Sequence, residues 1–324
     1  MFHRSAHLIA NNIIFDGILP LNLSSGVTLR RPNEAELFTI RGLLQTISGN
    51  SHSYWIPYEA LITQKEDING FTFTHTDNPA NWHYYLLSDD HGGTHVYALE
   101  QALLLLEPSI DLSIRVLSNL GDGSQAIKTS GHGGFMPHIF ERYHYGAHEV
   151  GNRLVLTTAD ILLTENISGQ IASLSTNYEF VKTAAQIWQE MRRISQSSRL
   201  QVIGFFSIIE CLITHSPRLA ESLDSISHQL CGKLRLITNR MGSNDLLTTT
   251  FGSATDGSAT DTKVWKRLYS YRSSIAHGNT VSFKREFSVL KSHKVVVDFL
   301  STFTRNLLLH ALNEPQLFSD LKDC

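Results

Sequence analysis

The sequence predicts an α+β protein, with a β-containing N-terminal domain over residues 1–172 and an all-α helical bundle over residues 173–324. Two observations support this division. Runs of β-branched and aromatic residues between Gly, Asn and Asp fill the first part, whereas apolar residues at helical spacing fill the second. A length of 324 residues suits two domains, and a hydrophobic content of 42% supplies their cores.

Strands are expected to dominate the N-terminal domain. The segment "GVTLRRPNEAELFTIRGLLQTI" predicts a short strand, a turn at Pro32 and a helix from about Asn33, with Glu34 and Glu36 in its first turn. Four later segments have the composition of strands joined by turns: "GFTFTHT", "WHYYLLS", "DLSIRVLS" and "NRLVLTT".

The second domain shows the period of amphipathic helices. We expect helices over 177–194, 199–216 and 219–237, and two more near 262–277 and 287–312. The second of these is apolar enough for a bundle core. The positions expected to face the core in the first and third helices are Phe180, Ala184, Ile187, Met191 and Ile194, and Leu219, Leu223, Ile226, Leu230 and Leu234.

Composition excludes several classes of protein. No run reaches the roughly 20 apolar residues of a membrane span, so no membrane association and a cytoplasmic location are expected. Cys211, Cys231 and Cys324 form no C-x-x-C pair, which argues against disulfides and structural zinc.

The tandem repeat "GSATDGSATD", residues 252–261, has no apolar content beyond alanine and predicts a mobile loop.

Charge is divided unequally along the chain. Residues 1–198 contain 12 Lys and Arg against 19 Asp and Glu, and residues 199–312 contain 14 against 8. A polyanion, if one binds, is therefore expected to meet the second part. The alternative is an ordinary solvated helical surface.

Arg272 and His277 lie at the end of a predicted helix that stops at Gly278. On one helix they differ by about 140° around the axis and about 7.5 Å along it, so they cannot easily grip one small group. Two copies of the helix facing across a two-fold axis would solve this problem. Histidine can exchange a proton near neutral pH, and arginine offers a planar fork to phosphate oxygens. The positions predicted to face the core here are Val264, Leu268, Tyr271 and Ile275.

The spacing of Arg and His is not informative by itself. With 17 arginines and 16 histidines, chance predicts about 2.5 pairs at four- to six-residue spacing. The sequence contains three: Arg142–His148, Arg272–His277 and Arg305–His310. Context must therefore decide between them.

The segment "LYSYRSSIAHG" resembles the signature of HEPN domains, in particular the Apea-like HEPN group, with its aromatic residue, Arg-Ser pair and closing His-Gly. The upstream "FFSIIECLITHS" is similar to the family's aliphatic helix with an internal glutamate, and "SISHQLCGKLRLI" to the helix after it. The resemblance covers about residues 175–312. "GVTLRRPNEAE" is also similar to segments that precede the bundle in Apea-like proteins.

The resemblance implies a bundle that forms a homodimer and, for many members, a metal-independent endoribonuclease without cofactors, active in anti-phage defence or as a toxin. Arg272 would bind the scissile phosphate of RNA and His277 would act as acid and base. Glu210 would be the polar residue facing the cleft, and Ser273 could hydrogen-bond His277. Asn279 replaces a tyrosine that some toxin members modify, so that form of regulation is not expected.

Each of these residues also has a structural interpretation. Glu210 could be a buried acid paired with a bundle arginine such as Arg235 or Arg267, and His277 could simply favour the helix dipole. Arg272 could be a structural dimer contact. The alternative function is accordingly a non-catalytic HEPN dimer that binds RNA or a protein partner.

The N-terminal domain has no signature of its own and is expected to sense a ligand or protein and to regulate the bundle. His144 and His148 have the spacing of a helical zinc pair, but Gly146 weakens a helix there and no third ligand is fixed. We therefore expect no metal site. The glycine turns "GHGG" and "GDGS" lack a P-loop lysine, and no G-x-S-x-G or C-x-x-C motif occurs.

Overall fold

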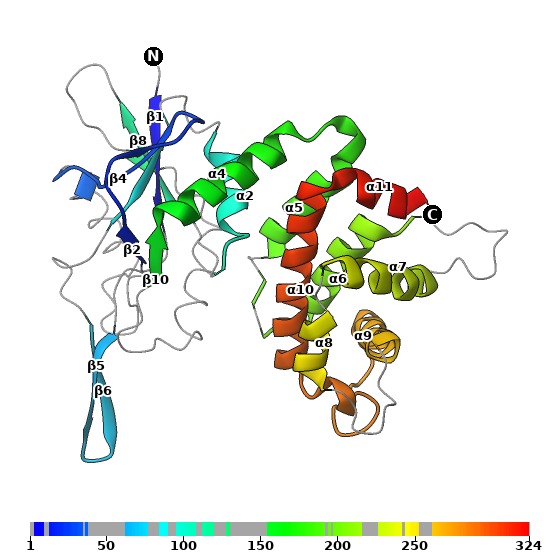
Figure 1. The fold of residues 1–324 in the computed structure, drawn as a ribbon. Helices are drawn as coiled ribbons and strands as arrows, with labels where there is room; N and C mark the ends of the chain where they lie inside the picture. Colours follow the sequence, from blue (N-terminus) through cyan, green and yellow to red (C-terminus); the bar gives the residue numbers. More distant parts are fainter. Residues whose placement is uncertain are drawn as a thin grey trace. The chain divides into compact units, whose positions relative to one another are not determined.

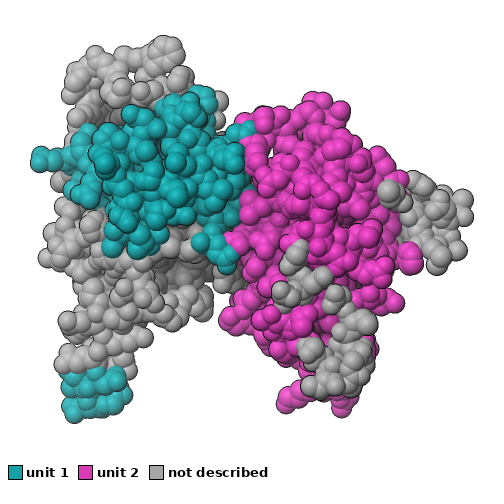
Figure 2. All heavy atoms as spheres, viewed as in Figure 1, with its two compact units in different colours: residues 1–169 teal, residues 170–324 magenta. Residues whose placement is uncertain are grey.

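A computed structural model divides the chain into two compact units, residues 1–169 and residues 170–324 (Figure 2). The structure describes residues 3–9, 13–34, 36–37, 62–76, 84–89, 95–107, 112–119, 128–129, 154–191, 194–195, 197–215, 226–241, 244–252 and 261–323.

Unit 1 is built on a six-stranded sheet with the order β3-β4-β7-β1-β8-β9. Each pair of neighbours in this sheet is antiparallel. A separate parallel pair joins β2 to β10, and β5 pairs with β6 as a hairpin. The strands are β1 His3–Ile9, β2 Ile13–Asp16, β3 Leu21–Asn22, β4 Val27–Arg30, β5 Ile62–Ile68, β6 Phe71–Thr76, β7 Leu86–Asp89, β8 Leu112–Asn119, β9 Lys128–Thr129 and β10 Leu154–Thr157.

The strand predictions from composition are largely confirmed, since β4, β6 and β10 lie within the predicted segments and β8 extends one residue beyond its segment. In the described part of "WHYYLLS", residues 84–88, Tyr84 and Tyr85 precede the strand, because β7 begins at Leu86. The hairpin turn between β5 and β6 is Asn69-Gly70, and both residues have positive φ values, 53° and 82°. This is the backbone conformation of a type I′ turn, which Asn-Gly favours.

The core of unit 1 follows the period of two residues in β4. Val27 and Leu29 are buried, whereas the residues that alternate with them, Thr28 and Arg30, are half-buried. Helix α2, Val96–Leu103, contributes further buried side chains to the same cluster. Tyr85 packs edge-on against Phe15, and its hydroxyl accepts a hydrogen bond of 3.0 Å from the Phe15 amide.

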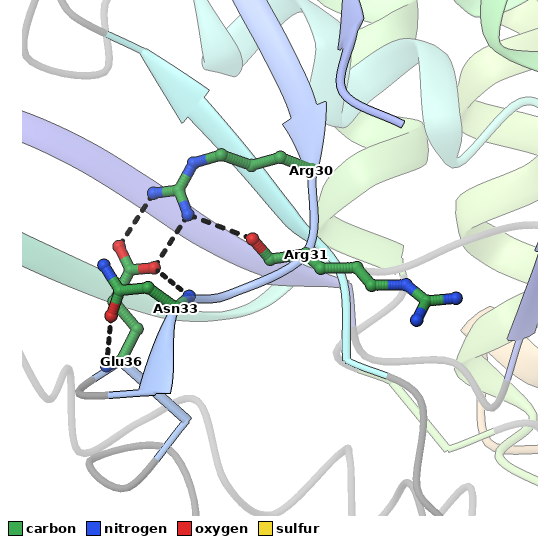
Figure 3. A network of polar contacts seen from close by, with 4 residues as sticks. All are labelled: Arg30, Arg31, Asn33 and Glu36. Atoms are coloured by element: carbon green, nitrogen blue, oxygen red, sulfur yellow. Dashed lines mark hydrogen bonds and ion pairs between the residues drawn. The ribbon is translucent and has the colours of Figure 1, made fainter. Parts of the chain in front are cut away.

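The predicted helix start at Asn33 is confirmed, and it holds an ion pair (Figure 3). Asn33 Oδ1 accepts from the Glu36 amide, and Glu36 Oε2 accepts from the Asn33 amide, both at 2.9 Å, which is a reciprocal capping box. Two nitrogens of Arg30 donate to the two oxygens of Glu36, each at 2.7 Å. Burial raises the pKa of Glu36, but the Arg30 fork and the Asn33 amide outweigh it and leave the pKa below its ordinary value.

The regular elements described in unit 2 are all helices, joined by turns and loops (Figure 1). Helix α4 begins at Thr158, directly after strand β10, and runs across the division between the units after residue 169. The helices are α4 Thr158–Ser173, α5 Glu179–Met191, α6 Leu200–Ile213, α7 Ile226–Met241, α8 Asn244–Phe251, α9 Asp261–Ala276, α10 His293–Asn313 and α11 Pro315–Asp323, with 3-10 turns η2 Thr176–Tyr178 and η3 Ser288–Leu290.

Helix α6 is the centre of this bundle, as its composition predicts. It contacts α5, α7, α9, α10 and α11. Nearly all of its apolar side chains are buried, which a helix surrounded by neighbours requires. The buried residues of α6 are Gln201, Val202, Phe205, Phe206, Ile208, Ile209, Leu212 and Ile213.

Three sequence predictions for the bundle need correction or limitation. On α5 the buried stripe includes Ala184 and Met191 but not Phe180 or Ile187, which are half-buried, because Val181 and Trp188 occupy the core side. The last long helix does not begin near residue 287. The predicted start of the third helix at 219–225 and most of the repeat at 252–261 lie outside the described residues.

The start of α10 has a local cause. Lys291 has a positive φ of 64°, and Ser292 Oγ accepts a hydrogen bond of 3.3 Å from the Val295 amide. Ser292 is therefore the N-cap, and the preceding residues form η3. Among the described helices, α10 alone has the length and hydropathy of a membrane span, and 56% of its most apolar 18-residue stretch is buried inside the protein.

Candidate functional site

Arg272 on α9 meets Glu210 on α6. Arg272 Nη2 donates to Glu210 Oε2 at 3.3 Å, and the two side chains are 25% and 18% exposed. Both residues lie at the edge of buried helix faces, since Leu268 and Tyr271 of α9 and Ile209 of α6 are buried. Glu210 is thus paired with a bundle arginine, as its structural interpretation expects, but the partner is Arg272 and not Arg235 or Arg267, both of which are exposed.

An aromatic ring covers the arginine. The guanidinium carbon of Arg272 lies 5.7 Å from the centre of the Tyr269 ring, one turn earlier on α9. Phe206 of α6 packs edge-on against Tyr269, with 5.9 Å between ring centres. The guanidinium is thus held between a carboxylate and a π face, an arrangement that Arg favours.

The electrostatics of this site differ from those of the Arg30–Glu36 pair. Burial raises the pKa of Glu210, and Arg272 only partly offsets the effect, so the pKa stays above its ordinary value. Burial and the nearby Glu210 carboxylate also raise the pKa of Tyr269, against the effect of Arg272. The single hydrogen bond of 3.3 Å from Arg272 stabilises the Glu210 carboxylate less than the two bonds of 2.7 Å from Arg30 stabilise that of Glu36.

Two buried atoms of the pair have no hydrogen-bond partner among the described residues: Glu210 Oε1 and Arg272 Nε. Leaving such atoms without a partner is costly in a folded protein. The guanidinium therefore has donor capacity that Glu210 does not use.

His277 closes α9. The Gly278 amide donates to the Ile275 carbonyl at 3.1 Å, and the Asn279 amide donates to the Ser274 carbonyl at 2.9 Å. With Gly278 at a φ of 68°, this is a Schellman motif, and the prediction that Gly278 ends the helix is confirmed. His277 is the last residue before the turn, and its side chain is exposed.

Ser273 and His277 are joined through the backbone. The His277 amide donates to the Ser273 carbonyl at 3.0 Å, and the Ser273 side chain is half-buried. The described contacts of these two residues include no bond from the Ser273 hydroxyl to the imidazole. The hydrogen bond between the Ser273 hydroxyl and the His277 imidazole therefore stays a prediction.

The other two Arg–His pairs differ from the pair on α9. Arg142 and His148 lie outside the described residues, as do the histidines His144 and His148 of the zinc pattern. On α10, His310 packs edge-on against Phe318, with ring centres 5.7 Å apart, and Arg305 donates to Asn306 at 3.3 Å. His310 thus has a packing role near a helix end.

Sequence reasoning missed Tyr269 and Phe206. Their signal was helical spacing: Tyr269 precedes Arg272 by three residues, and Phe206 precedes Glu210 by four. It also missed Lys322 of α11, which donates to the Cys211 carbonyl at 2.6 Å, next to Glu210. Burial lowers the pKa of Lys322 and raises that of the free thiol of Cys211.

Comparison with known proteins adds no relative to these observations. The chain matches no protein family, no curated protein and no solved structure.

Proposed function

We propose that the chain is a metal-independent endoribonuclease of HEPN type, with its site at Arg272, Glu210, Ser273 and His277. Arg272 binds the scissile phosphate, and His277 moves protons. Glu210 holds the guanidinium, and Ser273 lines the same end of α9. The N-terminal unit would restrain or trigger the bundle in response to a ligand or protein, as in anti-phage defence or toxin-type growth arrest.

The unused donor capacity of Arg272 is the observation that carries this proposal. Its guanidinium makes one bond of 3.3 Å to Glu210, while its buried Nε has no partner among the described residues. A phosphate in a ribonuclease site gains negative charge as the reaction proceeds, and fixed donors aimed at that charge lower the barrier. Arg30, saturated by Glu36, could not act in this way.

The reaction would proceed through the ribose. A neutral histidine takes the proton of the 2′-hydroxyl, and the 2′-oxygen attacks the adjacent phosphorus. The bond from phosphorus to the 5′-oxygen breaks, and a protonated histidine returns a proton to that oxygen. The products are a 2′,3′-cyclic phosphate and a 5′-hydroxyl. Acid–base help of this kind is worth about 10²–10⁴ in rate.

A dimer supplies the second histidine and the geometry. Arg272 and His277 of one α9 helix point about 140° apart on an ideal helix. Two α9 helices facing each other across a two-fold axis would bring the arginine of one copy near the histidine of the other. His277 is exposed, so it is open to such a contact.

The proposal is tested by incubating total RNA with the protein in EDTA, beside Arg272→Ala and His277→Ala. A matched control is Arg305→Ala with His310→Ala, because that pair has the same spacing on another helix. Cleavage by the wild type and the control, but not by the two site variants, is expected. Equal cleavage by all four would contradict the assignment of the site.

A non-catalytic HEPN dimer that binds RNA or a protein is the second candidate. The ion pair itself favours it, since Arg272 is already engaged and only 25% exposed. In that case the wild type would bind RNA or its partner without cutting RNA, with or without divalent ions.

A further inference from the structure

Helix α9 carries a row of cations beyond Arg272. Lys263, Lys266, Tyr269 and Arg272 recur at every third residue, so they form one ridge that turns by about 60° at each step and through about half a turn of the helix from Lys263 to Arg272. Lys263 and Lys266 are exposed, as is the neighbouring Arg267, and Tyr269 is half-buried. At 1.5 Å per residue the ridge extends about 13.5 Å from Lys263 to Arg272.

The exposed cations of this row have no ion-pair partner among the described residues. Within the part of the chain that the structure describes, Lys263, Lys266 and Arg267 make no ion pair or side-chain hydrogen bond. Lysines on other helices of unit 2 do have such partners. Lys182 lies 3.6 Å from Glu179, and Lys294 lies 2.6 Å from Asp298.

Helix stability does not account for the cations either. Lys263 lies in the first turn of α9, where the helix dipole favours carboxylates over amines. It also precedes Lys266 by three residues and Arg267 by four, positions at which like charges repel on a helix surface. Asp261, the first residue of α9, is the one acidic residue in the helix sequence. The row therefore weakens the helix that carries it, which points to a ligand.

We propose that the ridge Lys263–Lys266–Tyr269–Arg272 binds the backbone of single-stranded RNA and leads it to Arg272. This inference rests on the proposed function, because it takes Arg272 as the position of the scissile phosphate. Each ammonium is a mobile point charge suited to one phosphate. Tyr269, which is half-buried, stands between the lysines and the arginine along the ridge, and aromatic side chains are stacking positions for unpaired bases in other single-strand sites.

The test measures binding of a fluorescent 12-mer of oligouridine across a series of salt concentrations, with the full chain carrying His277→Ala to prevent cutting. Three proteins are compared: this parent, the parent with Lys263→Gln and Lys266→Gln, and the parent with Lys182→Gln and Lys294→Gln. The last is a control with the same change in net charge, taken from the ion-paired lysines.

The ridge variant should bind more weakly at low salt, and the slope of log K against log salt should fall by about 1.4, since each phosphate contact on a single strand contributes about 0.7. The control should keep the slope of the parent. The melting temperature of the ridge variant should not fall, because the lost charges opposed the helix. This last readout separates lost contacts from lost folding.

Several results would overturn the ridge assignment. The first is an equal slope in the ridge variant and the control. If the wild type still cleaves RNA in that case, the ridge assignment is rejected and the proposed ribonuclease activity is retained. A second is tighter binding of a duplex RNA of the same length, or of phosphatidylserine vesicles, than of the single strand. Absence of binding by the parent would reject both the ridge and the proposed function.

Discussion

Arg272 reaches Glu210 with a single nitrogen, at 3.3 Å, although the two side chains lie together at the crossing of α9 and α6. The Arg30–Glu36 pair of the same chain uses two nitrogens at 2.7 Å. Two pairs of identical chemistry thus differ in how fully the arginine is engaged. That difference is the basis of the proposal that Arg272, unlike Arg30, receives a further anion.

The two pairs should respond to pH in opposite ways. The pKa of Glu210 lies above its ordinary value of 4.5 in the folded state, so its contribution to stability is present below about 4.5 and is lost as pH rises through the folded pKa. The pKa of Glu36 lies below 4.5, so its contribution is present above that value and is lost as pH falls through the folded pKa.

Urea unfolding of Glu210→Gln and Glu36→Gln between pH 3 and pH 7 measures this directly. Relative to the wild type, Glu210→Gln should gain stability as pH rises, and Glu36→Gln should lose it. The same sign of slope for both variants would contradict the assignment of the two environments.

Tyr269 should matter for the position of Arg272 rather than for proton transfer. Replacing its ring with leucine removes a cation–π contact worth about 1 kcal/mol, or about fivefold in RNA affinity, while Tyr269→Phe keeps the ring and should retain affinity. RNA binding of the two variants in the His277→Ala background provides the measurement. An equal loss of RNA affinity in both variants would mean that the Tyr269 hydroxyl, and not its ring, supports RNA binding.

Gly278 fixes the end of α9 and hence the place of His277. A β-carbon at a φ of 68° costs roughly 1 kcal/mol, so Gly278→Ala should lower the free energy of unfolding by about that amount. Gly278→Asn should cost less, because Asn tolerates this conformation. RNA cleavage should decrease in the alanine variant more than in the asparagine variant. Unfolding free energies that rank the two variants the other way would argue against the Schellman end.

The parts of the fold that could be predicted from sequence have strong local causes. The aliphatic composition of residues 200–213 predicted a central helix, and α6 is buried among five others. Gly278 predicted the end of α9, and Asn33 with Glu36 predicted a helix start. In each case one residue type or one period decides the local structure.

The rest depends on contacts between distant residues. Spacing placed Glu210 on an apolar helix but could not choose its partner among several basic residues, because that choice follows from how α6 and α9 cross. The start of α10 was missed because the serine cap at Ser292 follows an apolar turn that continues the helical period. On α5, Trp188 takes the core position predicted for Ile187, since both lie near the boundary of the stripe.

The most direct test of the central claim uses one fluorescent RNA and a copy in which the nucleotide before the cut carries a 2′-deoxyribose. Both are incubated with the wild-type protein in EDTA, and the ends of the products are identified by mass spectrometry. Attack by the 2′-hydroxyl predicts that the RNA is cut to a 2′,3′-cyclic phosphate, while the deoxy copy binds but stays intact at that position. Cleavage of both at the same site, or of neither, would contradict the account.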